Sequence, residues 1–185
     1  MVTKFDKLKK HPRIVASVLI VTAVGALALS LSIGQQGLNP SYDGTYKDTV
    51  VVPDYQTILP VDKSIEQLGG WKRVGPPKGE AIFAFSDKVD NVRIDVTEQP
   101  LPESFKSGTA SKVSDLALGY AANTKLTSDD TTIYVGTSIK GKQSVILTKY
   151  NLLILIKSQN RIDDDSWKDY IRKLNSINDS QVPKF

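Results

Sequence analysis

The chain has 185 residues, with 24 basic and 20 acidic side chains and a formal net charge of +4. Five of the basic residues and one acidic residue come before Ile14, so the remainder carries 19 of each and is neutral. A neutral folded part lacks the basic surface that nucleic-acid binding requires, and this excludes a nucleic-acid partner.

The side chains of many catalytic and metal sites are missing from most of the chain. There is no cysteine, and the one histidine, His11, lies in the basic N-terminal part. Disulfides, zinc sites with thiolate or imidazole ligands, and nucleophilic catalysis by Ser–His or Cys–His pairs are therefore excluded from the remainder.

Residues 1–13 form a basic arm, and residues 14–33 are 20 consecutive residues without a charge. At about 1.5 Å per residue, a helix of this length spans the roughly 30 Å hydrocarbon layer of a bilayer. Basic flanks stay on the cytoplasmic side, so the arm determines the topology. Its cations are Lys4, Lys7, Lys9, Lys10 and Arg13. This predicts a single-pass protein of the bacterial cytoplasmic membrane, with lipid around residues 14–33 and the C-terminal domain outside.

Cleavage of the same segment as a signal peptide is the alternative. Ala26-Leu27-Ala28 is an acceptable small-x-small site, and cleavage there would release a secreted binding protein. Apolar residues continue through Leu29, Leu31 and Ile33, beyond the length of a signal's hydrophobic region, and this favours a retained anchor.

Residues 34–54 are rich in Gly, Asn, Pro, Ser and Asp, which predicts a flexible stalk containing a short edge strand at 49–53. An extracytoplasmic domain then covers residues 55–185. Its first half begins with a helical turn at 64–68, ended by Gly69-Gly70. We expect strands at 70–74, 80–86 and 92–97 and a proline-containing loop at 98–108.

A helix is expected at 109–123, with Thr109 or Ser111 as its N-cap, because apolar residues there repeat at helical spacing. Strands follow at 131–138, 143–150 and 152–158, joined by turns at 140–141 and 150–151. The five aliphatic residues 152–156 predict a central strand buried on both faces. A second amphipathic helix at 163–177 carries Trp167 and Tyr170 on its apolar stripe, where core packing is expected.

These elements predict the α+β class. Short connections make neighbouring strands antiparallel, giving a sheet of about six strands. The simplest arrangement packs both amphipathic helices on one face of that sheet.

Two stretches carry a resemblance, "IYVGTSIKGKQSVILTKYNLLILIKS" with "DDDSWKDYIRKL", and "PPKGEAIFAFSDKVDNVRIDVTEQPLPESF". Over residues 56–178 the chain resembles uncharacterised single-anchor membrane proteins of ultrasmall, reduced-genome bacteria. Its layout is also similar to the domain-of-unknown-function ectodomains of anti-sigma-like and sporulation-associated membrane proteins. The resemblance implies an extracytoplasmic α+β module and transfers no functional residue.

Carboxylates are the remaining candidates for chemistry. Asp163, Asp164 and Asp165 lack the 1, 3, 5 ligand spacing and the glycine of an EF-hand, and capping of the following helix is favoured over a metal site. Asp129-Asp130 is interpreted as a turn. A glycan hydrolase would need two facing carboxylates. Glu80, Asp95, Glu98 and Glu103 are the candidates, and their sequence context is that of a solvated surface.

Aromatic and proline residues suggest a ligand or partner surface at one edge of the sheet. They are Trp71, Pro76, Pro77, Pro100, Pro102 and Phe105. The alternative for Trp71 and Phe105 is packing beneath a loop or on the sheet.

Taken together, the sequence favours a membrane-anchored extracytoplasmic binding or scaffolding module of the cell envelope. We expect no enzymatic activity, no cofactor and no metal, and a protein or envelope component as partner. The alternatives are a carboxylate-dependent hydrolase of cell-wall or surface glycan and the secreted binding protein.

Overall fold

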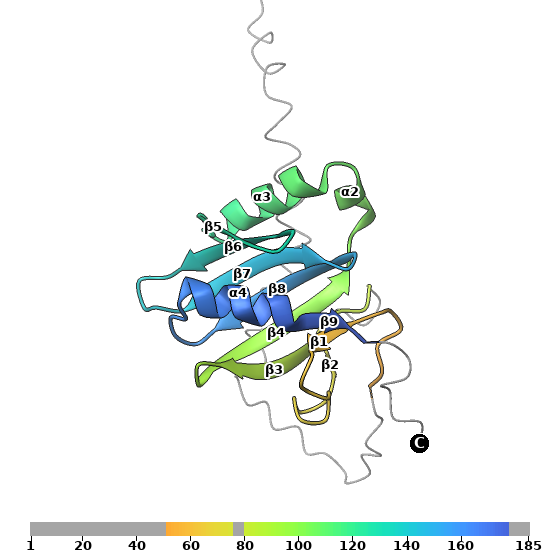
Figure 1. Cartoon of the computed structure of the whole chain (residues 1–185). Coiled ribbons are helices and arrows are strands. Elements are labelled where there is room, and N and C mark those ends of the chain that lie inside the picture. The colour runs from red at the N-terminus through yellow and green to blue at the C-terminus, as the bar shows by residue number, and fades with distance from the viewer. Residues whose placement is uncertain (1–50, 76–79, 178–185) are drawn as a thin grey trace, which may run out of the picture. The chain divides into compact units, whose positions relative to one another are not determined.

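The fold is seen in a computed structural model that describes residues 51–75 and 80–177 (Figure 1). All of these residues belong to the second of two units into which the chain divides, Leu38–Phe185. The expected basic arm, the membrane segment 14–33 and most of the stalk 34–54 lie outside the described residues.

An antiparallel sheet of seven strands is the main element of the described part. In spatial order its strands are β2 (Lys72–Arg73), β3 (Phe83–Val89), β4 (Val92–Pro100), β8 (Leu152–Ser158), β7 (Gln143–Lys149), β6 (Thr131–Thr137) and β5 (Thr124–Ser128). Two further strands, β1 (Ile58–Pro60) and β9 (Leu174–Ser176), pair with each other. The helices are α2 (Glu103–Lys106), α3 (Thr109–Gly119) and α4 (Asp164–Lys173). The predicted α+β class and antiparallel sheet are confirmed, with one more strand in the sheet than expected.

Tight turns determine the order of the strands. Residues with positive φ occur at Asp90-Asn91, Asp129 and Tyr150-Asn151, the connections β3–β4, β5–β6 and β7–β8. Positive φ at both central residues, as in the β3–β4 and β7–β8 turns, matches the right-handed twist of a hairpin, so these neighbouring strands pair directly. The two halves of the sheet then join through β4 and β8, with Val96 opposite Ile156.

The central position of β8 confirms the prediction for residues 152–156. All five side chains are buried, and β8 lies between β4 and β7. A strand that buries both faces requires a layer on each side of the sheet.

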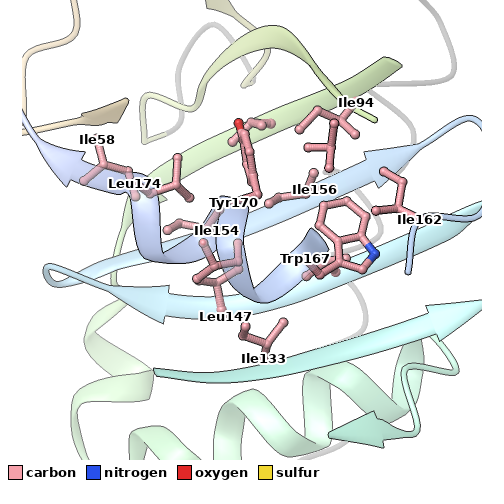
Figure 2. Close-up of a cluster of buried hydrophobic side chains, with 14 of the residues drawn as sticks. Ile58, Ile94, Ile133, Leu147, Ile154, Ile156, Ile162, Trp167, Tyr170 and Leu174 are labelled. Atoms are coloured by element: carbon pink, nitrogen blue, oxygen red, sulfur yellow. The ribbon is translucent and has the colours of Figure 1, made fainter. Parts of the chain in front are cut away.

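One of these layers is α4, which lies across one face of the sheet (Figure 1). Trp167 and Ile171 are fully buried and Tyr170 is nearly so, packed with Ile154 and Ile156 of β8 (Figure 2). Core packing of Trp167 and Tyr170 is thereby confirmed.

The second layer is α3, and it covers the opposite face. Strand residues alternate between faces, so Gly136 of β6 faces away from Val135, which belongs to the core under α4. A Cβ at Gly136 would lie 2.9 Å from the main chain of Ala121 and Ala122, just after α3. The expectation that both helices share one face is therefore wrong. An amphipathic pattern identifies the buried side of a helix and does not specify which face of the sheet it meets.

Several local predictions are corrected. Residues 65–69 form a turn without a helix, and 51–53 are not in a strand. α3 begins after Gly108, with no side-chain cap from Thr109 or Ser111. The expected C-terminal helix ends at Lys173, because residues 174–176 form β9.

Candidate functional site

Trp71 packs on the aromatic residues of β3. Its ring is half-buried and meets Phe83 and Phe85 edge-on, with centroid distances of 6.3 and 5.5 Å. Phe105, in α2, is only 4% exposed and lies outside the core cluster to which Trp71 belongs. The structure therefore gives both residues packing positions, which is the alternative that the sequence left open.

The prolines of the expected ligand surface fall at different places. Pro100 ends β4 opposite Leu152, and Pro102 is the N-cap residue of α2. Both are half-buried, whereas Pro76 and Pro77 lie outside the described residues. The ligand surface therefore stays a prediction.

Asp163 caps α4, as the sequence predicted. Its Oδ1 accepts hydrogen bonds from the main-chain N–H groups of Asp165 and Ser166, at 3.0 and 2.8 Å. These bonds and the Ser166 hydroxyl stabilise the charged carboxylate and lower the pKa of Asp163. The described residues contain no group of three or more Asp, Glu, His or Cys side chains that could hold a metal ion.

The four candidate carboxylates of a hydrolase do not converge. Glu80 and Glu103 are exposed. Asp95 accepts from the hydroxyl of Ser86 at 2.8 Å and pairs with Arg93 at 3.2 Å, on the sheet face opposite Glu98. Asp95 and Glu98 therefore do not face each other across one substrate, as a glycan hydrolase would require.

Glu98 is the main correction, because its side chain is fully buried rather than solvated. It continues the apolar side of β4 after Ile94 and Val96, between Phe83 of β3 and Ile154 of β8. Its Oε2 accepts the main-chain N–H of Ile58 in β1 at 3.0 Å. Burial raises the pKa of Glu98 to about 8, and the hydrogen bond from Ile58 opposes part of this rise. The neutral form of this side chain therefore persists to higher pH than that of an exposed glutamate.

A second buried carboxylate lies on the same side of the sheet. Asp87 of β3 is 8% exposed and forms an ion pair with Lys63. The ring of Tyr170 reaches from α4 toward these strands (Figure 2). Burial raises the pKa of the Tyr170 hydroxyl well above its usual range, and the charges of Asp87 and Glu98 add to the effect.

We call Asp87, Glu98 and Tyr170 the buried polar cluster. Within the described part of the chain, Glu98 Oε1 is buried without a hydrogen-bond partner, and the buried Tyr170 hydroxyl and Asp87 Oδ2 have none of normal geometry, although the hydroxyl interacts with the Asp87 carboxylate. Leaving such atoms unpaired costs free energy, so the cluster is locally unfavourable to folding. Burial and the lack of a charge partner make Glu98 the member suited to respond to pH.

Sequence reasoning missed this cluster for an identifiable reason. The period of two that contains Val92, Ile94 and Val96 continues to Glu98, but Pro100 and Pro102 favoured a loop from residue 98 onward. Asp87 likewise falls in step with Phe83 and Phe85. A polar residue in phase with an apolar strand face was the available signal.

In residues 51–75 and 80–177, none of the helices has the length and apolar character needed to cross a membrane. The predicted segment 14–33 and the topology-determining cations of the arm lie outside these ranges.

Comparison with known proteins gives no further assignment. No family model, curated protein or solved structure matches the chain.

Proposed function

We propose that the protein is a single-pass membrane protein whose extracytoplasmic α+β domain binds or scaffolds a component of the bacterial cell envelope. The observation that carries the proposal is the uncharged 20-residue segment 14–33, preceded by a basic arm that accounts for the whole net charge. The neutral composition after residue 33 and the resemblance to single-anchor membrane proteins support the same assignment.

The binding or scaffolding role is favoured by where the described carboxylates lie. Glu98 is buried, Asp95 is on the other face of the sheet, and Glu80 and Glu103 are exposed. This dispersed arrangement is less suited to a glycan hydrolase, the alternative, because that chemistry requires two carboxylates about 5 to 10 Å apart.

Membrane fractionation with intact-mass measurement tests the anchor. We expect the chain to stay in the membrane after extraction with alkaline carbonate, at a mass that includes residues 14–33. A soluble product that begins near Leu29 would contradict the proposal and support the secreted alternative.

Crosslinking in intact cells, followed by purification of the tagged chain, tests the binding role. A discrete species heavier than the chain supports it, and the mass of that species identifies the partner. The same chain with residues 55–185 deleted is the control and should lose the species. If the deleted chain keeps it, or if no species forms, the domain does not act by binding.

A further inference from the structure

Glu98 is hydrogen-bonded to two points of the segment 55–60, through its main chain and its side chain. The hydroxyl of Tyr55 donates to the main-chain oxygen of Glu98, and the N–H of Ile58 donates to Glu98 Oε2 at 3.0 Å. The Tyr55 oxygen also accepts the N–H of Phe83 at 3.3 Å. One residue of β4 thus connects the beginning of the domain to the seven-stranded sheet.

Few other main-chain bonds hold this segment. β1 has three residues and pairs with β9, which also has three. β1 and β9 are separate from the seven-stranded sheet. Two further main-chain bonds extend their pairing: the N–H of Ile177 donates to the carbonyl oxygen of Thr57, and the N–H of Val61 donates to that of Lys173. Short pairings of this kind open at lower free energy than a central sheet, so the segment is held mainly by the burial of Ile58 and Leu59 in the core and by its attachment to Glu98.

Burial disfavours a negative charge on Glu98, and among the described residues the N–H of Ile58 is the contact that favours it. β8 contributes the apolar side chain of Ile154 opposite Glu98, and α4 contributes the Tyr170 hydroxyl. The other buried carboxylate on this side, Asp87 of β3, lies further along the strands, opposite Ile94, and is paired with Lys63. Tyr55 adds a hydroxyl whose pKa burial raises, and the charges of Glu98 and Asp54 raise it further.

Another lysine contact with α4 comes from β7. Lys149 of β7 donates to the main-chain oxygen of Ile171 at 2.8 Å, and burial lowers the pKa of this lysine. Ionised Glu98 would be a fully buried charge beside apolar side chains, with a hydrogen-bond donor on Oε2 and none on Oε1. Such a charge is relieved when the covering segment moves away and water enters.

We propose that Glu98 is a pH-sensitive latch, which holds residues 55–60 on the sheet while its carboxyl is protonated and releases them when it ionises. The segment follows directly on residues 34–54, so release would loosen the junction between the expected stalk and the domain. The proposal concerns only the attachment of this segment and stands whether or not residues 14–33 cross a membrane.

Hydrogen exchange of the full chain in detergent micelles tests the latch, with protection factors corrected for the intrinsic pH dependence of exchange. Release requires loss of the Glu98 proton, so protection of residues 55–60 falls about tenfold per pH unit between pH 6 and 8. We expect the protection of residues 55–60 to be about a hundredfold lower at pH 9 than at pH 6. At both pH values it should be lower than the protection of β7. Glu98→Gln, which cannot ionise, keeps the same protection at both pH values.

Glu103→Gln is the matched control, because Glu103 is an exposed carboxylate five residues further along, and it should behave as the unmodified chain. If Glu98→Gln does not fold, the protection of residues 55–60 relative to that of β7 in the unmodified chain still tests the latch. Protection of residues 55–60 that changes less than tenfold between pH 6 and 9 would overturn the latch. Equal protection of residues 55–60 and β7 would also overturn it, because only global unfolding would then expose the segment.

Discussion

Replacing Glu98 by Gln should destabilise the folded domain at pH 5 and stabilise it at pH 8. The carboxyl is fully buried, and burial raises its pKa to about 8 in the folded chain, against 4.5 for the unperturbed group. Below pH 4.5 the group is protonated in both states, so its contribution is fully present there. As the pH rises toward 8, the unfolded chain is ionised while the folded chain keeps the proton, and stability is lost progressively.

The expected magnitude follows from the pKa difference. Each pH unit between about 5 and 8 costs about 1.4 kcal/mol, or about 4 kcal/mol over the three units. Gln keeps the shape and can accept the N–H of Ile58, but its amide N–H groups lack a partner, which costs about 1 to 3 kcal/mol at every pH. The variant should be less stable than the unmodified chain at pH 5 and more stable at pH 8.

Urea unfolding of the full chain in detergent micelles, followed by the fluorescence of Trp71 and Trp167, measures this difference. Glu103→Gln serves as the control and should show no crossover. A free-energy difference between Glu98→Gln and the unmodified chain that stays constant from pH 5 to pH 8 would refute the reasoning, because Glu98 would then not change its protonation on unfolding in this range.

Three further substitutions test the packing by the same unfolding assay. Gly136→Ala places a Cβ 2.9 Å from the main chain that follows α3, and should destabilise the domain by about 1 to 3 kcal/mol. If α3 lay elsewhere, the substitution would instead stabilise the domain, as Gly to Ala usually does in a strand. Gln143→Leu removes the oxygen that accepts the N–H of Ile162 at 2.8 Å and the indole N–H of Trp167 at 3.1 Å. The free energy of unfolding should fall by about 2 to 4 kcal/mol, and a fall of less than about 1 kcal/mol would argue against these two hydrogen bonds. Tyr170→Phe removes a buried hydroxyl whose contact with the Asp87 carboxylate lacks normal hydrogen-bond geometry, and should change stability by less than about 1 kcal/mol. Clear destabilisation would show that the hydroxyl is hydrogen-bonded to Asp87.

Elements determined by local pattern could be predicted from the sequence. The aliphatic run of β8 is found at the centre of the sheet, and turn residues with positive φ join β7 to β8. Asp163 caps α4 as expected, because a cap bonds N–H groups two and three residues away.

Features that depend on distant parts of the chain could not be predicted. Glu98 is covered by β1, which lies 40 residues earlier, and β1 pairs with β9 across more than a hundred residues. Strands of three residues give too short a pattern to recognise. β5 has one apolar residue, Leu126, and was missed because an edge strand needs little burial. The face covered by α3 depends on the path of its connections.

Topology is the central claim, and the absence of cysteine from the chain makes it directly measurable. Ile139 lies in the β6–β7 turn and is fully exposed, so Ile139→Cys offers a reporter on the domain, and Leu8→Cys offers one in the basic arm. With a membrane-impermeant maleimide, we expect labelling of Ile139→Cys in intact cells and labelling of Leu8→Cys only after lysis. Labelling of Ile139→Cys only after lysis, or of Leu8→Cys in intact cells, would contradict an outward-facing domain.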